Sequence, residues 1–304
     1  MRTDRSRGVF ALVLTTALWG ISFPLVGDVV EGRSQGQLLL FLFLRFSLAT
    51  LAFLPLAGVL RDATRSAGAR AWLLSLGVGA LLFVGFYLQT WGLKYTTAGR
   101  SAFLTVLSVP MVPLFAALWH RRRPSPVHLG ASLVATLGIG LVLAPGGSLE
   151  PNLGDGLTLL SACAFALEIL LLEAVTRRAP TSIVAVGQIA GVALIAGLAL
   201  LVVPFEIPES WPGLTRGVVV TGLLCTTFAL GLMTWGQARV RAEVAAVIFA
   251  LEPIFASGFE WGVYGVGLGP WQLAGAGVVF ASVVWAARIP VEAAPCEADG
   301  GRVG

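Results

Sequence analysis

Charged residues are scarce in this sequence. Asp, Glu, Lys and Arg make up 12% of its 304 residues, whereas soluble globular chains average about 25%. Hydrophobic residues make up 57%, and the mean hydropathy is +0.87. A soluble chain could not bury this much apolar surface. The composition therefore excludes a soluble globular domain and predicts an integral membrane protein.

Cysteine and histidine are also few. Cys163, Cys225 and Cys296 form no spaced pair, so neither a disulfide framework nor a metal site is indicated. His120 and His128 both lie near one predicted membrane edge, which argues against a metal cluster or a histidine-based triad. The sequence contains no glycine-rich phosphate loop ending in Lys and Ser or Thr, so we expect no ATP hydrolysis and no cofactor.

Long apolar runs fill most of the chain. Each is close to the length of about 20 residues that a membrane-spanning helix needs. The pattern predicts an all-α polytopic membrane protein with ten transmembrane helices and short loops. The predicted spans are 9–27, 37–60, 72–92, 100–119, 127–144, 157–176, 182–203, 216–236, 244–265 and 271–288.

The basic residues divide unequally between the two sides of these spans. If the N-terminus is cytoplasmic, nearly all arginines fall in inner segments, including the run Arg121 to Arg123. The outer segments hold only Arg33, Lys94, Arg100 and Arg216. Because cytoplasmic loops are enriched in Lys and Arg, we expect both termini in the cytoplasm and the chain in the cell membrane. Topology explains these short basic clusters, and no nucleic-acid partner is expected.

The segment from Tyr87 to Pro113 has an unusual pattern. It contains two apolar stretches joined by a few polar residues, and Pro110 and Pro113 interrupt the second. A similar apolar run with an internal proline returns at Pro253. Inside a membrane, interrupted helices occur beside cavities, where other groups satisfy the freed carbonyls. We therefore expect Pro110 and Pro253 to act as hinges beside a binding cavity.

The two halves of the chain have related patterns. Ser108-Val109-Pro110 in the fourth span parallels Leu251-Glu252-Pro253 in the ninth. Five helices per half is an odd number, so the second copy must enter the membrane upside down. Inverted repeats of this kind are typical of secondary transporters, which bind substrate between the halves. The predicted units are a first five-helix repeat at 9–144, a second at 154–288 and a disordered tail at 289–304.

Several short motifs, taken in order, resemble the EamA-type family of the drug/metabolite transporter superfamily. The resemblance covers about residues 9 to 288. It implies a ten-helix carrier with two inverted EamA units around a central cavity, which exports amino acids or other small metabolites. The motifs are Trp19-Gly20-Ile21-Ser22-Phe23, Phe43-Leu44-Arg45, Gly92-Leu93-Lys94-Tyr95-Thr96-Thr97-Ala98, Phe103-Leu104-Thr105, Gly154-Asp155, Leu251-Glu252-Pro253 and Pro270-Trp271-Gln272.

Five charged residues fall inside predicted spans, where each is energetically costly and suggests function. Glu168 is interpreted as a cavity carboxylate that binds a substrate amine or cycles a proton; the alternative is a protonated group in helix packing. Glu252, beside the turn that Pro253 weakens, is interpreted as a carboxylate that senses substrate or solvent; the alternative is a protonated glutamate that caps freed backbone groups. Glu173 is expected to pair with Arg177 one turn later. Arg45 and Glu260 lie at comparable depths, and a structural ion pair between them is the favoured interpretation.

Polar and aromatic residues in the first, third, fourth, sixth and eighth spans complete the candidate site. Aromatic rings there could stack on a substrate cation or ring, and packing or interfacial anchoring is the alternative for each one. Gly187-x-x-x-Gly191 predicts a close helix contact. The predicted substrate-binding residues are Trp19, Ser22, Tyr87, Gln89, Thr105, Ser108, Phe165, Glu168, Gln237 and Glu252, with Thr226 and Thr227 as further polar candidates.

The favoured function is a secondary transporter, most simply an exporter of small metabolites such as amino acids, that alternates access around a central cavity. Its partners are then a small-molecule substrate and the lipid bilayer, with proton coupling through Glu168 or Glu252 as one mode. Two alternatives remain open. One is an intramembrane enzyme that uses the two carboxylates, although no nucleophile–base set is recognisable. The other is a membrane scaffold without transport.

Overall fold

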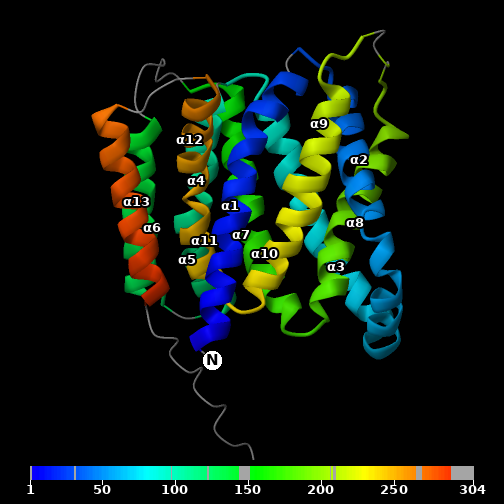
Figure 1. Ribbon diagram of the computed structural model, residues 1–304, viewed down its shortest axis with the longest axis horizontal. Helices are drawn as coiled ribbons and strands as arrows, with labels where there is room; N and C mark the ends of the chain where they lie inside the picture. The colour runs from blue at the N-terminus through cyan, green and yellow to red at the C-terminus, as the bar shows by residue number, and fades with distance from the viewer. Residues whose placement is uncertain are drawn as a thin grey trace, which may run out of the picture.

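The structure is a computed structural model that describes residues 2–30, 32–96, 98–121, 123–143, 151–205, 207, 210–264 and 269–288. Every regular element among these residues is a helix (Figure 1). The predicted tail at 289–304 lies outside the described residues. The elements of the first half are α1 (Arg2–Val30), α2 (Gln35–Leu51), a 3-10 turn (Leu54–Leu56), α3 (Ala57–Gly92), α4 (Ala98–Val106), α5 (Ser108–Trp119) and α6 (Pro126–Leu143). Those of the second half are α7 (Leu153–Thr176), α8 (Thr181–Leu200), α9 (Leu214–Val220), the π-helix η2 (Thr221–Phe228), α10 (Ala229–Gln237), α11 (Ala242–Phe249), α12 (Glu252–Tyr264) and α13 (Pro270–Arg288).

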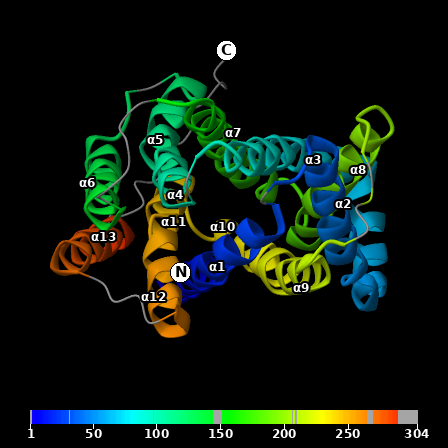
Figure 2. The ribbon, with the colours of Figure 1, turned by 90° about the horizontal axis from the view of Figure 1, so that it is seen from above.

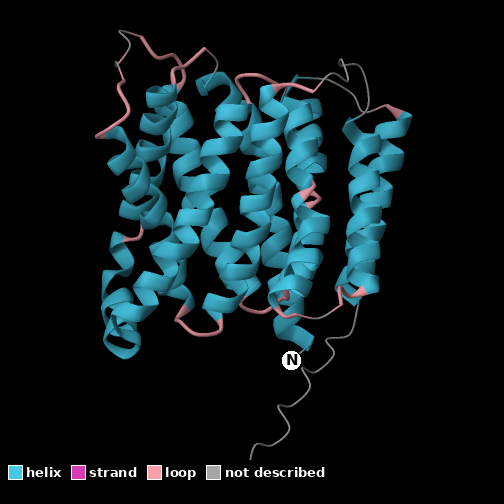
Figure 3. Ribbon diagram, turned by 180° about the vertical axis from the view of Figure 1, so that it is seen from behind, coloured by secondary structure: helices cyan, strands magenta, loops and turns pink. Residues whose placement is uncertain are grey.

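Long apolar helices stand side by side, and most loops lie at the two ends of the bundle (Figure 3). In the described residues, six helical stretches are long and apolar enough to cross a membrane. They are Gln35–Gly92, Leu153–Thr176, Thr181–Leu200, Leu214–Gln237, Ala242–Phe259 and Pro270–Arg288. Phe103–Trp119 and Pro126–Leu141 are shorter apolar helices. The all-helical membrane fold agrees with the prediction, whereas the count of ten spans stays a prediction.

The second predicted span, 37–60, is longer than the helix that forms there. α2 ends at Leu51, and a 3-10 turn containing Pro55 separates it from α3. Proline has no N–H to continue the hydrogen-bond ladder, so the apolar run does not stay one helix. Within α3, Gly68 has φ 70°, a left-handed conformation that separates the polar first part from the apolar part that follows.

Side-chain caps fix where two of the helices begin. The Ser34 hydroxyl accepts the Gln37 N–H at the start of α2, and Gln37 Oε1 accepts the Ser34 N–H in return. Asn152 and Asp155 form the same reciprocal capping box at the start of α7. Asp155 Oδ1 also accepts a hydrogen bond of 3.2 Å from Thr96, which ties the end of α3 to α7.

The bundle has a central group of helices that is flanked by further helices on two sides. α6 packs against α13 at one side, and α8 packs against α2 and α3 at the other (Figure 2). Between them, α1 contacts α10 and α12, while α7 contacts α3, α4 and α5. The α3–α8 contact is close because it uses small residues: Gly187 faces Ser75, and Gly191 faces Gly79. The close-packing face predicted from Gly187 and Gly191 is confirmed.

Two predicted spans are each divided into two helices near their middle. α4 ends at Val106, and α5 begins at Ser108 after Leu107. α11 ends at Phe249, and α12 begins at Glu252 after a turn at Ala250 and Leu251. The two breaks come at corresponding places, just before Pro110 and Pro253. They lie where the sequence pattern predicted interrupted helices.

Glu173 connects α7 to the start of α11. The predicted pair of Glu173 with Arg177 is confirmed, and Glu173 Oε2 also accepts the Ala242 backbone N–H at 3.0 Å. A carboxylate at a helix N-terminus satisfies a free N–H and interacts favourably with the helix dipole. Glu173 therefore has a cross-helix role that its spacing to Arg177 did not reveal.

Replacing Glu173 with Ala is expected to destabilise the folded protein, because it removes the only side-chain acceptor found for the Ala242 N–H among the described residues. The loss should be about 1 kcal/mol, or roughly 2–4 °C in melting temperature for the purified protein in detergent. Arg177→Ala is the matched control, since it removes only the exposed partner and should change little. Equal losses in the two variants would contradict a capping role.

Candidate substrate cavity

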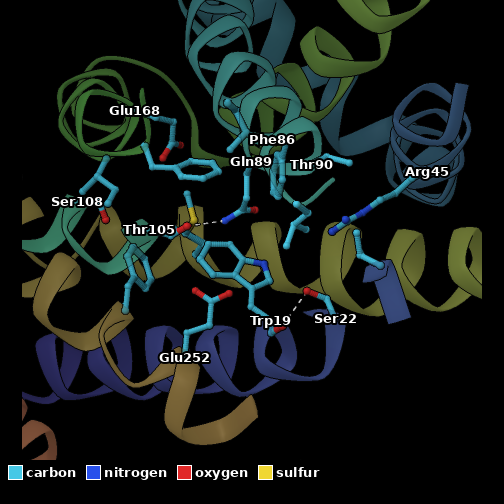
Figure 4. A pocket seen from close by; sticks show the side chains of 17 residues that line it. Trp19, Ser22, Arg45, Phe86, Gln89, Thr90, Thr105, Ser108, Glu168 and Glu252 are labelled. Atoms are coloured by element: carbon cyan, nitrogen blue, oxygen red, sulfur yellow. Dashed lines mark hydrogen bonds between the residues drawn. The ribbon is translucent and has the colours of Figure 1, made fainter. Parts of the chain in front are cut away.

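A cavity opens in the centre of the bundle, between helices of both halves of the chain. Its empty space, including the space that is open to the outside, is about 840 Å³. Side chains from α1, α2, α3, α4, α5, α7, α10, α11 and α12 form its wall. Of the ten residues predicted to bind substrate, the wall includes Trp19, Ser22, Gln89, Thr105, Ser108, Phe165, Glu168 and Glu252 (Figure 4).

Hydrogen bonds fix several of the polar wall residues. Gln89 Nε2 donates to Thr105 Oγ1 at 2.9 Å, which joins α3 to α4 across the wall (Figure 4). The Thr105 hydroxyl in turn donates to the Ser101 carbonyl of its own helix. Ser22 donates to the Trp19 carbonyl at 2.7 Å. These groups present hydroxyl and amide atoms to the cavity in fixed positions.

Two carboxylates face the cavity from different halves of the second repeat. Glu168 comes from the middle of α7 and is 2% exposed, and its Oε1 has no hydrogen-bond partner within the described residues. Glu252 is the first residue of α12, immediately after the break that follows α11. A buried carboxyl group that the protein leaves unpartnered is available to bind a proton or a cationic ligand.

The prolines stand beside the two helix breaks. Pro110 is the third residue of α5, and Pro253 is the second residue of α12. At these positions a proline interrupts no hydrogen bond, because the first N–H groups of a helix have no intrahelical partner. Each proline therefore starts a new helix and does not bend a continuous one. Whether the breaks move as hinges stays a prediction.

A π-helical segment supports the wall from behind. In η2 the hydroxyls of Thr226 and Thr227 donate to carbonyls five residues earlier, those of Thr221 and Gly222. The Cys225 carbonyl accepts the Trp19 Nε1–H at 3.0 Å. Trp19 also packs against Phe249, with ring centroids 5.4 Å apart. The π-segment thus orients the Trp19 indole at the cavity wall.

Arg45 is a wall residue that the sequence prediction left out of the site. It is 3% exposed, and its Nε donates to Thr226 Oγ1 at 2.7 Å. The side chain of Glu260, its predicted ion-pair partner, lies outside the described residues, so that pair stays a prediction. The charge of Arg45 inside an apolar span could have identified it as a site residue. The sequence analysis instead interpreted Arg45 as half of a structural ion pair.

Tyr87 and Gln237 do not contribute to the cavity wall. Tyr87 stacks on Phe83, with centroids 5.7 Å apart, and also contacts Trp91 on its own helix. Neighbouring positions of α3, Phe86 and Gln89, face the cavity in its place. Gln237 ends α10 and is 1% exposed, away from the wall. Helical phase decides which polar residues face the cavity, and the sequence pattern did not resolve that phase.

The comparison with protein families identifies the chain. The model of the EamA-like transporter family matches it twice, at residues 6–144 and 152–288. This chain belongs to the EamA-like transporter family. The family resemblance seen in the sequence motifs is therefore confirmed, and the boundary between the two matches falls between α6 and α7.

Relatives of this EamA-like protein are named as transporters. An "Uncharacterized transporter" of Archaeoglobus fulgidus is 28% identical over 90% of this chain and 83% of the relative. A "Probable biotin transporter" of Pseudomonas aeruginosa is 31% identical over 78% and 82%. A "Probable terminal-alkyne amino-acid exporter" of Streptantibioticus cattleyicolor is 26% identical over 82% and 83%.

A solved crystal structure has the same fold. It superimposes with a TM-score of 0.72 at 18% identity, over 94% of this chain and 96% of the other. At that identity the likeness extends to the fold alone. Together, the family match and the apolar helices indicate a multi-pass membrane protein of a transporter family.

Proposed function

We propose that this EamA-like protein is a secondary transporter that exports small organic metabolites such as amino acids by alternating access. The central cavity is the observation that carries this proposal. It lies between the two family repeats, and its wall contains Arg45, Glu168 and Glu252 together with aromatic and hydroxyl side chains. Such a mixture of groups suits an amphipathic small molecule with both charged and apolar parts.

The proposed architecture is ten spans in two inverted repeats, 9–144 and 154–288. In a two-fold arrangement, each contact between one helix of the first repeat and one of the second has a counterpart. The contact of α1 with α10 has its counterpart in that of α3 with α7, and the contact of α1 with α12 in that of α5 with α7. The pairs α2–α8 and α6–α13 join equivalent helices. This pairing supports the repeats.

We further propose that both termini are cytoplasmic, because the basic clusters gather on the side of the N-terminus. On that side several helices contact one another in this conformation. Gly8 of α1 packs against Gly236 of α10, and Glu173 joins α7 to α11. Alternating access would require these contacts to part, with the breaks before Pro110 and Pro253 allowing the half-helices to tilt.

The substrate class is supported by the named relatives as well as by the cavity. Amino acids and biotin, which the names of the relatives give, are both small organic acids with an apolar part. A cationic side chain, two carboxylates and aromatic rings in one cavity suit such molecules. The proposed direction, export, is based on the relative that is named as an amino-acid exporter. Glu168 or Glu252 is the proposed proton carrier.

Counterflow into proteoliposomes tests the proposal directly. Purified protein is reconstituted, loaded with one unlabelled compound and exposed to traces of the same labelled compound, for a panel of amino acids, biotin, sugars and nucleosides. We expect saturable accumulation of amino acids or a related organic acid, and none in protein-free vesicles. If folded and inserted protein accumulates no member of the panel, metabolite transport as proposed is wrong.

A further inference from the structure

Arg45 is a charged group that the fold keeps deep inside the bundle. It lies near the middle of α2, its side chain is almost fully buried, and it forms part of the cavity wall. An arginine within a membrane-spanning segment is energetically costly unless it has partners or faces a polar cavity. A structural arginine would normally be paired with a carboxylate. Among the described residues, none of the ion pairs includes Arg45.

The described contacts of Arg45 hold its position, and none of them is with a carboxylate. Its Nε donates to the Thr226 hydroxyl, which is itself fixed by donating to the Thr221 carbonyl at 2.8 Å. The guanidinium lies 5.5 Å from the ring centroid of Phe46 and 5.3 Å from that of Phe86. Both rings attract the cation through their faces. One hydroxyl and two rings therefore orient the side chain.

Among the described residues, neither terminal nitrogen of the guanidinium has a hydrogen-bond partner. The guanidinium has five N–H donors: the one on Nε binds Thr226, and the other four lie on the two terminal nitrogens. The side chain reaches from α2 toward the cavity space, opposite Glu168 and Glu252, with Trp19 and Gln89 between them (Figure 4). The cavity thus has a cationic end and an acidic end. A bound ligand can complete the hydrogen bonding of the cationic end.

We propose that Arg45 is the docking residue for a carboxylate group of the transported substrate. The two terminal nitrogens form a planar fork that matches the two oxygens of a carboxylate. A singly charged carboxylate fits this cavity better than a dianionic phosphate, because Glu168 and Glu252 share the space. The inference deepens the proposed function, on which it rests, by naming the group that the cavity recognises.

Ligand binding to purified protein tests this docking without requiring transport. Melting temperature in detergent is measured with a panel of amino acids and biotin, each beside its carboxamide, and with a phosphate monoester. We expect at least one carboxylate to stabilise the protein and its carboxamide not to do so. Stabilisation by carboxamides or phosphate monoesters in preference to carboxylates, or by no carboxylate of the panel, overturns the proposal.

Variants of Arg45 then assign the effect to this side chain. For the stabilising carboxylate, Arg45→Gln should raise the Kd roughly tenfold to a hundredfold, the usual effect of losing a hydrogen bond to a charged group. The Kd of Arg45→Lys should lie between those of the unchanged protein and Arg45→Gln, since lysine keeps the charge but lacks the planar pair of terminal nitrogens. Arg65→Gln is the control, because Arg65 is exposed and pairs with Asp62 outside the cavity. An unchanged Kd in folded Arg45→Gln overturns the proposal.

Thr226 should act through Arg45 as a positioning residue. Thr226→Val keeps the side-chain shape and removes the acceptor for Nε, so it should weaken binding of the carboxylate but not of any ligand that lacks one. Thr226→Ser should restore affinity, because it keeps the hydroxyl. Equal weakening of all ligands by Thr226→Val would indicate a general packing defect and contradict positioning.

The two proposals can fail separately. If the protein transports only neutral or cationic compounds, the transporter proposal stands and the role of Arg45 is wrong. If carboxylates bind with an affinity that depends on Arg45 but are not moved across the membrane, the docking site stands and transport as proposed is wrong.

Discussion

Replacement of Glu252 with Gln is expected to lower uptake driven by a pH gradient by about tenfold or more, because a carboxamide cannot take up and release a proton. Glu252 faces the cavity at the point where α11 ends and α12 begins. It would therefore lie close to a bound substrate and to the half-helices that we propose move. Glu168→Gln tests the second carboxylate in the same way. The residue that carries the proton should show the larger loss.

Counterflow of the same labelled substrate separates coupling from binding. Exchange of one substrate molecule for another needs no net proton movement, so the variant that has lost coupling should retain counterflow while it loses gradient-driven uptake. Asp62→Asn serves as the control, since this carboxylate is exposed and remote from the cavity wall. If both variants keep the full response to the gradient, neither carboxylate is the proton carrier. Loss of counterflow as well would assign the carboxylate to substrate binding.

Replacement of Gly79 with Leu is expected to disrupt the contact between α3 and α8. A Cβ atom at Gly79 would lie 2.5 Å from the Gln188 carbonyl oxygen and 3.0 Å from the Gly191 Cα. Both neighbours are backbone atoms, which cannot rotate away as a side chain would. The helices would have to separate, at a cost of about 1–3 kcal/mol or more, which corresponds to a fall in melting temperature of roughly 5 °C or more.

Gly77 offers a matched control on the same helix. A Cβ atom there meets nothing within 4 Å. Gly77→Leu gains the same helix propensity as Gly79→Leu, so the difference between the two variants isolates the packing term. Melting temperature and monodispersity in detergent are the measurements. A Gly79→Leu protein as stable as Gly77→Leu would show that α3 and α8 do not pack as closely as described.

The sequence predicted the helical membrane fold because its apolar runs are long and its charges are few. Helix breaks near Pro110 and Pro253 were also predictable, since a proline within an apolar span is best accommodated in the first turn of a new helix. The end of α2 was not predicted, because the apolar residues around Pro55 continue the apolar run of the sequence beyond the last residue of the helix. The π-helix η2 was also not predicted, since residues 221–228 have no composition that distinguishes them from an α-helix.

The candidate site was predicted in part, for a similar reason. Charge and polarity within a span marked Glu168, Glu252 and Gln89, and these line the cavity. They also marked Tyr87 and Gln237, which face elsewhere, because residue type does not fix helical phase. Arg45 was set aside as half of an ion pair, since a sequence shows that a charge is buried but not which partner it meets.

The π-helix has a further consequence for how the chain tolerates length changes. Each residue of an α-helix advances the backbone by about 100°, so one residue more or fewer turns everything beyond it to a new direction. The π-segment already contains about one residue more than an α-helix of the same reach, because its hydrogen bonds span five residues and not four. Deleting a single residue between Thr221 and Phe228 should therefore restore ordinary α-helical spacing and leave Ala229–Gln237 close to its present direction. The same deletion between Ala229 and Leu232 has no extra residue to remove, so it would turn Met233 away from the cavity and Thr234 away from Gln188, to which it is bonded at 2.7 Å. A deletion of one residue should therefore be easier to accept in the π-segment than in the α-helix that follows it.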